Sequence, residues 1–324
     1  MSSEWRRFGW QQMTFLAPAD WYLTKISTER ASGELWLADA NQVTRLQIKW
    51  NDASSEKKVN PKATLTAYLA SVERAAKKRK LPFRTERDLR FFRGGQTDVS
   101  SLEGYHWIST EEAYGAIWYS PKSLRVTLTQ VNGVAGEGDL KGLAKRVINS
   151  LSDAPQGEDD LWTAYDLTCS VPGDFALAEQ HMETGRTELG FTRGKQGEKL
   201  ALARYGLAAI ALERVGDLGD WAYQQRFKRW YSYDLKRELA NYGNWSCVRF
   251  TGIKKSWRER LRHRIYGFLR RRLPVALTAW VWHCPEQNVI LLVEQQHDPR
   301  DESLVPRLAD QMLAAPVLLP APKG

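Results

Sequence analysis

The sequence predicts an α+β fold made of two tandem repeats, each a mostly antiparallel sheet packed with helices. Three observations support this prediction. Two halves of the chain match at a constant offset, strand-like segments follow one another through short turns, and each half ends in a helical pattern. Strands that run in groups joined by turns form antiparallel sheets, and each half is long enough to bury a core of its own.

The internal repeat begins near the start of each half. MTFLAPADWYL (13–23) aligns with LTCSVPGDFAL (167–177), and RLQIKW (45–50) aligns with KLALAR (199–204), both at an offset of 154 residues. The ends also match, because GAIWYSPKSLRVTLTQ (115–130) and TAWVWHCPEQNVILLVEQ (278–295) each read as strand, turn and strand. A period this long indicates domain duplication rather than a solenoid. We expect a first repeat over 1–153, a linker over 154–160 and a second repeat over 161–324.

Within each repeat the same elements are expected in the same order. Alternating apolar residues predict three early strands, near 12–16, 33–38 and 43–50 in the first repeat and near 165–171, 186–192 and 199–205 in the second. A helix follows, over 61–80 and over 220–242. Two or three further strands then lead to a terminal helix, over 139–151 and over 302–314.

This order of elements resembles the Mog1/PsbP-like family. The resemblance is carried by an early strand that ends in proline and is soon followed by an aromatic residue, as in Pro18-Ala19-Asp20-Trp21 and Pro172-Gly173-Asp174-Phe175. It implies an antiparallel sheet between helices and an adaptor more than an enzyme, because family members bind a GTPase or a photosynthetic membrane complex. The family supplies no catalytic set to carry over, and the tandem arrangement departs from its pattern.

Composition restricts the compartment and the kind of partner. The chain has 324 residues, ordinary apolar and charged content, and a net charge of +9, which favours an acidic partner. Three widely spaced cysteines cannot form a disulfide framework and are typical of a reducing compartment. With no signal sequence and no apolar run of about 20 residues, we expect a cytoplasmic protein without a transmembrane segment that can contact a membrane at its periphery.

The search for reactive residues predicts no catalytic, cofactor or metal site. The five histidines have no metal-ligand spacing, and His283 and Cys284 are strand neighbours whose side chains point to opposite faces. Cys169 matches Phe15 and is expected in the core. The Gly-rich stretch 131–142 lacks the Gly-Lys-Ser/Thr of a phosphate loop and is interpreted as a loop with a helix cap. The acid pairs Glu111-Glu112 and Asp159-Asp160 are interpreted as solvated loop charges rather than a general acid/base pair. An enzyme whose site gathers distant residues stays an alternative.

The positive charge is concentrated in two segments. Residues 254–273 hold nine Lys or Arg and one Glu, a net charge of +8, and residues 74–93 hold nine Lys or Arg and two acidic residues, a net charge of +7. The rest of the chain therefore carries a net charge of −6. In the first repeat Lys77, Lys78, Arg79 and Lys80 end a predicted helix, where cations are favoured by the helix dipole alone.

Residues 256–273 are predicted to form a basic amphipathic helix that is an addition to the duplicated fold. Ser256 and Glu259 form a capping box, and on a helical projection Trp257, Phe268, Leu261 and Ile265 lie within an apolar arc of about 120°. The first repeat has only residues 95–104 at the place we align with it. Together with the first basic cluster, this helix supplies the candidate residues for binding a partner or anion: Lys254, Lys255, Trp257, Arg258, Arg260, Arg262, Arg264, Phe268, Arg270, Arg271, Arg272, Lys77, Lys78, Arg79 and Lys80.

Three interpretations of this helix are open. Its apolar side can pack on the protein's own sheet, it can lie on an anionic membrane or an acidic membrane-complex subunit, or its arginines can contact nucleic acid phosphates. We expect a non-enzymatic binding or assembly module that docks through this helix on an anionic membrane surface or an acidic protein partner. Nucleic-acid binding through the same patches is the alternative.

Overall fold

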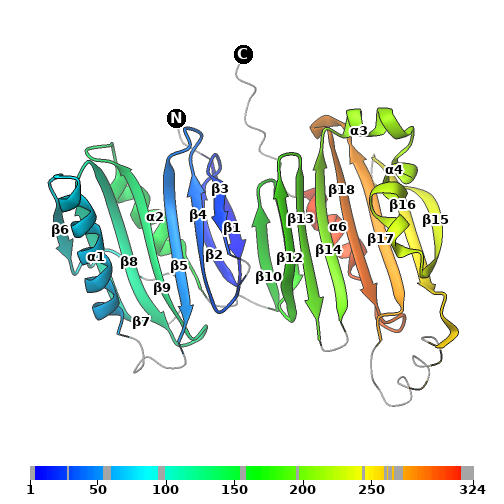
Figure 1. Cartoon of the computed structure of the whole chain (residues 1–324), viewed down its shortest axis with the longest axis horizontal. Coiled ribbons are helices and arrows are strands. Elements are labelled where there is room, and N and C mark those ends of the chain that lie inside the picture. The colour runs from blue at the N-terminus through cyan, green and yellow to red at the C-terminus, as the bar shows by residue number, and fades with distance from the viewer. Residues whose placement is uncertain are drawn as a thin grey trace. The chain divides into compact units, whose positions relative to one another are not determined.

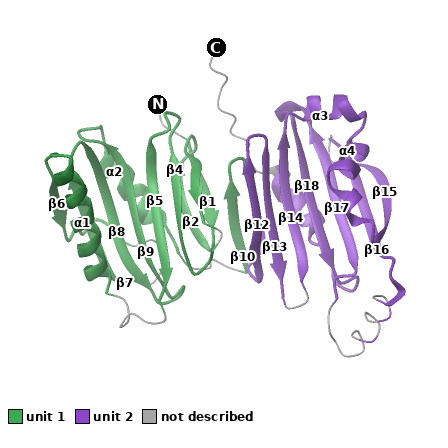
Figure 2. Ribbon diagram, viewed as in Figure 1, with its two compact units in different colours: residues 1–166, 317–324 green, residues 167–316 purple. Residues whose placement is uncertain are grey.

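The computed structural model describes residues 4–27, 29–53, 60–93, 99–153, 158–194, 197–242, 245–258, 261, 265 and 273–314. The chain divides into two compact units, whose described parts meet between Asp166 and Leu167 (Figure 2). The first unit contains the elements β1 (Trp5–Trp10), β2 (Met13–Pro18), β3 (Tyr22–Ile26), β4 (Ser32–Ala38), β5 (Thr44–Asp52), α1 (Pro61–Lys78), β6 (Arg84–Arg87), β7 (Ser100–Ile108), β8 (Glu111–Ser120), β9 (Arg125–Val134), α2 (Leu140–Ser150) and β10 (Asp159–Ala164).

The second unit repeats this succession with a longer central region. Its elements are β11 (Leu167–Pro172), β12 (Phe175–Glu183), β13 (Arg186–Arg193), β14 (Glu198–Gly206), α3 (Ala208–Val215), α4 (Leu218–Gln225), the 3-10 turn η2 (Phe227–Trp230), β15 (Tyr233–Tyr242), β16 (Trp245–Lys254), β17 (Ala276–Cys284), the 3-10 turn η3 (Pro285–Gln287), β18 (Val289–His297) and α6 (Val305–Ala314).

Each unit contains a seven-stranded antiparallel sheet, and the two sheets have the same strand order (Figure 1). The first runs β3-β4-β5-β9-β8-β7-β6, and the second runs β12-β13-β14-β18-β17-β16-β15. In each seven-stranded sheet, the strand that comes last in the chain pairs with the third strand of the first meander, β9 with β5 and β18 with β14. The prediction of an α+β fold with two similar, mostly antiparallel units is therefore confirmed.

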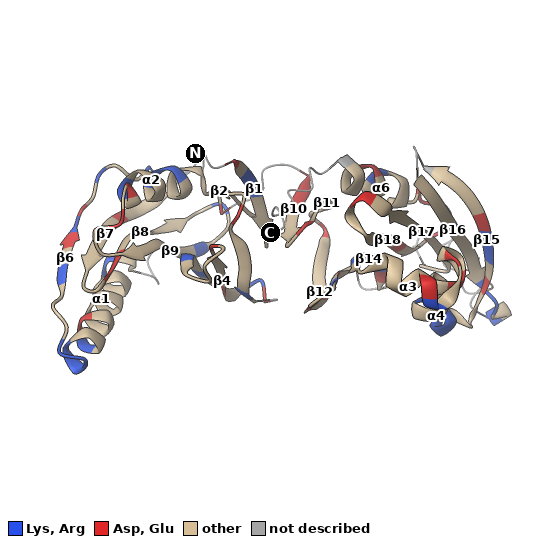
Figure 3. Cartoon of the chain, turned by 90° about the horizontal axis from the view of Figure 1, so that it is seen from above, with Lys and Arg blue, Asp and Glu red and all other residues tan. Residues whose placement is uncertain are grey.

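Helices lie on both sides of each sheet (Figure 3). In the first unit α1 contributes Leu65 and Leu69 to a buried cluster with Tyr105, Trp107 and Ile117 of β7 and β8. In the second unit α4 contributes Trp221 and Ala222 to a corresponding cluster with strand residues that include Phe250. The other face carries α2 in the first unit and α6 in the second, which contacts β17 and β18. This α6 face of the second sheet is where the candidate site lies.

Local signals fix the ends of the helices that were predicted correctly. Asn60 accepts a hydrogen bond from the Ala63 amide at 3.1 Å and Pro61 follows at the first helical position, so α1 begins where a cap and a proline coincide. Asp139 caps α2 by accepting from the Gly142 amide at 2.8 Å. The Gly-rich stretch 131–142 is thus the end of β9, a turn and a capped helix start.

Two assignments made from sequence are wrong. The helix predicted over 220–242 is the short helix α4, the turn η2 and the edge strand β15. The ten residues of β15 pair in register with β16, from Tyr233 opposite Lys254 to Tyr242 opposite Trp245, and this ladder outweighs the local helical pattern. Asp160 is not a solvated loop charge either, because it is the second residue of β10 and its side chain is buried, and burial raises its pKa. Glu112 likewise lies in strand β8, and its Oε1 lies 2.9 Å from His106 Nε2.

Strand β10 lies in the first compact unit, where it contacts β1, and it pairs with β11 as β1 pairs with β2. The Gly9 amide of β1 donates to Thr163 Oγ1 at 3.2 Å, and the rings of Trp10 and Trp162 lie 5.0 Å apart in an edge-to-face arrangement. An aromatic pair of this geometry adds to the apolar area it buries. Residues 154–157 of the proposed linker lie outside the described residues.

Asp153 is a buried carboxyl that gives the first unit a testable pH dependence. Its Oδ2 accepts from Trp118 Nε1 and from Thr127 Oγ1, both at 2.9 Å, and all three residues are fully buried. Burial raises the pKa of the Asp153 carboxyl above its ordinary value, and these hydrogen bonds offset only part of that effect. The neutral carboxyl stabilises the fold fully at pH values below the pKa that Asp153 has in the unfolded chain. This stabilisation is lost as the pH rises through the pKa of Asp153 in the folded protein.

We therefore expect Asp153→Asn to raise the free energy of unfolding at pH values above the folded pKa of Asp153, with no gain in acid, where the wild-type carboxyl is already neutral. Urea unfolding followed by tryptophan fluorescence, repeated in acid and at neutral pH, measures the difference. The exposed Asp20→Asn provides a control with the same chemical change. A neutral-pH stability of Asp153→Asn equal to that of the wild type would contradict the expectation.

Candidate binding surface of the second unit

The clearest difference between the two repeats is an insertion between β16 and β17. In the first unit Ile108 and Glu112 are cross-strand partners, and residues 109–111 join them. In the second unit the corresponding partners are Ile253 and Ala276, and residues 254–275 lie between them. The counterpart of the basic segment is therefore 109–111, and the alignment with 95–104 made from sequence was wrong.

The described residues of the insertion include the start of a helix with an exposed apolar side. Trp257, Arg258, Leu261 and Ile265 are helical, and the strand preceding them ends at Lys254. Trp257, Leu261 and Ile265 are 64%, 46% and 54% exposed. Residues four apart share one helix face, so these three side chains form an apolar stripe that faces away from the core. The interpretation in which they pack on the protein's own sheet does not hold for them.

Backbone hydrogen bonds explain why this segment leaves the sheet. The Lys254 amide donates to the Val275 carbonyl at 3.0 Å, and the Lys255 amide donates to the Ser232 carbonyl at 2.8 Å. These bonds close the ends of the β15–β16 and β16–β17 ladders. Residues 255–258 therefore continue the chain from the end of the sheet (Figure 2).

The other predicted partner-binding residues fall into three groups. Lys254 and Lys255 lie at the end of β16 beside the groove described below. Lys77, Lys78, Arg79 and Lys80 lie at the C-terminal end of α1 in the first unit, where Lys77 pairs with Glu73 at 2.7 Å. Seven predicted residues lie outside the described part of the chain: Arg260, Arg262, Arg264, Phe268, Arg270, Arg271 and Arg272.

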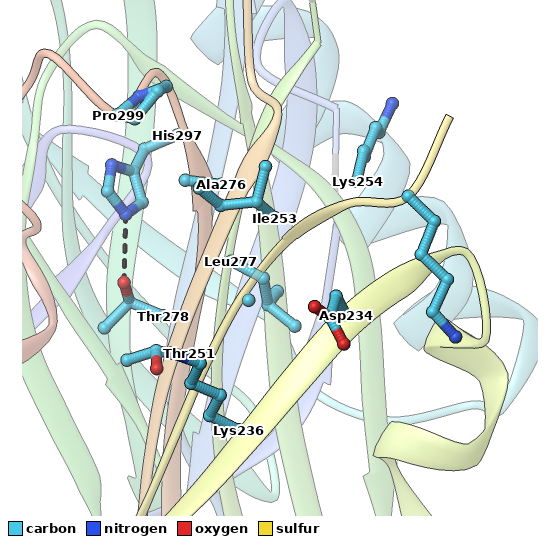
Figure 4. A pocket seen from close by; sticks show the side chains of 12 residues that line it. Asp234, Lys236, Thr251, Ile253, Lys254, Ala276, Leu277, Thr278, His297 and Pro299 are labelled. Carbon is cyan, nitrogen blue, oxygen red and sulfur yellow. Dashed lines mark hydrogen bonds between the residues drawn. The ribbon is translucent and has the colours of Figure 1, made fainter. Parts of the chain in front are cut away.

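A groove of about 780 Å³ lies on the α6 face of the second sheet, next to the insertion (Figure 4). The register of the strands determines which residues form the floor of this groove. Asp234, Ile253, Ala276 and His297 are successive cross-strand neighbours on β15, β16, β17 and β18, and Lys236, Thr251 and Thr278 form the adjacent row. Residues two apart on a strand share a face, so both rows point to the same side. Small side chains in the middle of these rows leave the hollow.

Polar groups line this groove at both ends. His297 is 6% exposed, its Nδ1 lies 3.0 Å from the Asp298 carbonyl oxygen and its Nε2 lies 3.0 Å from Thr278 Oγ1. Lys236 and Lys254 lie toward the insertion and the edge strand, together with Asp234 (Figure 4), and Lys255 also lines the groove. Among the described lining residues, three ammonium groups and one carboxylate lie at this end of the groove, and ammonium groups attract anions.

A second polar feature, a buried ion cluster, lies on the opposite face of the same sheet. Arg226, 4% exposed, donates to Glu188 and, at 2.8 Å, to Glu294 Oε2. Burial alone would raise the pKa of Glu188, but Arg226 and Arg186 outweigh burial and hold that pKa below its ordinary value. The carboxylates likewise hold the pKa of Arg226 above its ordinary value in spite of burial. The charged side chains of this cluster pair with one another, so we interpret the cluster as structural.

The cysteines and histidines do not assemble into a reactive site in the described part of the chain. Cys169, Cys247 and Cys284 are buried free thiols, as expected for Cys169. Burial raises the pKa of the Cys284 and Cys247 thiols, which lowers the thiolate fraction needed for nucleophilic chemistry. Among the described residues no group of three or more His, Cys, Asp or Glu side chains is placed to hold a metal ion.

Comparison with known proteins finds no family model that matches this chain and no curated protein of similar sequence. The resemblance to Mog1/PsbP-like proteins therefore rests on the sequence motif alone. Within the described residues, no helix has the length and apolar character needed to cross a membrane.

Proposed function

We propose that this protein is a non-enzymatic binding module, located in the cytoplasm at the membrane periphery, that docks on an anionic membrane surface through the inserted segment 254–273. The observation that carries the proposal is the exposed apolar stripe of Trp257, Leu261 and Ile265 within the most basic segment of the chain. Apolar and aromatic side chains on one side of a helix with arginine and lysine on the other are typical of helices that lie in a membrane interface.

Charge and apolar area act together in this mode of binding. A basic residue near an anionic lipid surface contributes about 1 kcal/mol, so the net charge of +8 over 254–273 supplies attraction that neutral lipids do not offer. The exposed stripe adds the burial of indole and aliphatic side chains in the interface. An aromatic anchor at residue 257 distinguishes this proposal from binding to nucleic acid phosphates, which needs only the cations.

Neutralising the arginines should abolish most of this binding. We expect the variant with Arg258, Arg260, Arg262 and Arg264 all changed to Gln to bind vesicles of phosphatidylcholine and phosphatidylserine about 1,000-fold more weakly than wild type, since four charges at about 1 kcal/mol each are lost. Vesicle flotation with the full chain measures this affinity. Binding of the wild type should also weaken with added salt and be absent on vesicles of phosphatidylcholine alone.

A charge-matched control comes from the first unit. The variant with Lys77, Lys78, Arg79 and Lys80 changed to Gln loses the same four charges but keeps segment 254–273, so it should bind vesicles like the wild type. An equal loss of vesicle affinity in both variants would mean that binding depends only on the net charge of the protein. Wild-type binding to double-stranded DNA with a steep salt dependence, combined with no binding to anionic vesicles, would favour the nucleic-acid alternative instead.

A further inference from the structure

The groove on the α6 face exists because the second repeat lacks side chains that fill the same place in the first. By strand register, Thr251, Ala276 and Thr278 of the second unit occupy the positions of His106, Glu112 and Tyr114 in the first. In the first unit the His106 ring stacks on Tyr114 at 4.2 Å, and His106 Nε2 lies 2.9 Å from Glu112 Oε1. Larger and mutually bonded side chains therefore fill this position there.

A chain segment also covers this place in the first unit. The Leu89 amide donates to the Gly104 carbonyl at 3.2 Å, the Phe91 ring lies 6.3 Å from Tyr114, and Phe92 is buried against Gly104. In the second unit the two strands that correspond to β6 and β7 continue instead as the ten-residue ladder of β15 and β16. This position is thus filled in the first unit and hollow in the second, where it adjoins the insertion.

The residues around this opening have the chemistry of an anion site with an apolar wall. Lys236 and Thr251 are cross-strand partners, so an ammonium group and a hydroxyl group stand side by side on the floor, with Lys254 and Lys255 beside them. Ammonium and hydroxyl groups donate hydrogen bonds to phosphate oxygens. Ile253, Ala276 and Pro299 supply apolar surface, and Ile253 is 46% exposed.

Size and position indicate which anion fits. A groove of about 780 Å³ exceeds what a single phosphate group needs, so its occupant has further atoms to place against the apolar wall. Lys255 lines the groove and the exposed Trp257 follows two residues later, within about 7 Å along the chain. A surface that receives the Trp257 side chain therefore brings its own phosphate groups close to the groove.

We infer that this groove binds the phosphate headgroup of one anionic lipid from the surface on which segment 254–273 docks. The inference rests on the proposed function for its source of ligand, but the groove itself can be tested with a soluble headgroup. Lys236 and Lys254 neutralise the phosphate, Thr251 donates a hydrogen bond to it, and the glycerol moiety contacts Ile253 and Ala276. The helix supplies general attraction to the surface, and the groove supplies preference for a headgroup.

The test uses isotope-labelled full-length protein titrated with glycerophosphoglycerol and, separately, with inorganic phosphate, followed by amide NMR shifts. We expect glycerophosphoglycerol to shift the amides of Thr251, Thr278 and His297. Lys236→Gln and Thr251→Val should each weaken this binding about tenfold, because each removes one donor to a charged oxygen. Lys228→Gln, an exposed lysine on η2 at the opposite face of the sheet, should leave it unchanged.

Each outcome separates the groove from the docking helix. Groove shifts with glycerophosphoglycerol that Lys236→Gln and Thr251→Val weaken support the inference, whether or not the wild type binds vesicles. No shift at the groove, or equal weakening by Lys228→Gln, overturns it. Inorganic phosphate that binds as tightly as glycerophosphoglycerol overturns the lipid assignment in favour of free phosphate. Failure of wild-type vesicle flotation beside intact headgroup binding would refute the proposed docking function alone.

Discussion

Replacing residues 254–275 with Ser-Thr-Glu should abolish binding to anionic vesicles and leave both sheets folded. Ser109, Thr110 and Glu111 make the same connection in the first unit, between Ile108 and Glu112, whose counterparts are Ile253 and Ala276. The replacement therefore keeps the register of β16 and β17 while it removes the basic segment completely. Binding to anionic vesicles should be lost completely rather than partly, because the replacement removes both the apolar stripe and the net charge of +8.

The structure also indicates how much this replacement should lower the free energy of unfolding. Val275 is 5% exposed, and the Leu273 amide donates to Asp298 Oδ2 at 2.8 Å, so both are lost from the packed part of the insertion. We expect a decrease of about 2 kcal/mol in the free energy of unfolding, mainly from the buried valine. Circular dichroism and urea unfolding check that the variant is folded, and vesicle flotation measures binding.

The converse transplant is the matched control. Moving residues 254–275 into the first unit of the shortened variant, in place of 109–111, joins the segment to a hairpin of the same topology. Binding to anionic vesicles should return, because the docking residues lie within the segment itself. A shortened variant that still floats with vesicles would place the membrane contact elsewhere on the molecule.

Much of the fold could be predicted from sequence because its signals are local. The alternation of apolar residues in 45–50 and 199–204 indicates strands wherever they pair, and the match between MTFLAPADWYL and LTCSVPGDFAL gives the duplication. The helix expected over 220–242 was wrong for the opposite reason. The ten-residue ladder with β16 decides the conformation of β15, and a ladder depends on a partner that local periodicity does not reveal.

The site was only partly predictable for the same physical reason. The basic segment is contiguous, so its charge and apolar arc can be counted in the sequence. The groove instead joins Lys236, Thr251, Thr278 and His297 from four strands, and their proximity follows from register. The repeat itself contained a signal for the groove. When the strands of the two units are aligned correctly, small residues of the second unit align with the larger His106, Glu112 and Tyr114 of the first.

The ion cluster of the second unit provides the largest expected change in stability. Arg226→Met should lower the free energy of unfolding by about 3–5 kcal/mol, because it leaves the carboxylates of Glu188 and Glu294 buried without their cation. The methionine side chain keeps much of the volume, so cavity formation contributes little. Urea unfolding of the full chain measures the loss, and Arg237→Met is the matched control. Arg237 pairs with Asp217 and Asp220 while 35% exposed, so its removal should cost less than about 1 kcal/mol.

The triple variant Arg226→Met, Glu188→Gln and Glu294→Gln distinguishes charge from packing. Because the unpaired charges are then absent, most of the lost stability should return, although buried amides need hydrogen bonds of their own. The pH dependence has a definite sign. The pKa of Glu188 is depressed, so its stabilising contribution is present above the unfolded value of about 4.3 and is lost as pH falls through the folded pKa. The wild type should therefore lose stability in acid more steeply than the triple variant. If the triple variant is no more stable than Arg226→Met, the arginine stabilises the unit through packing rather than through its charge.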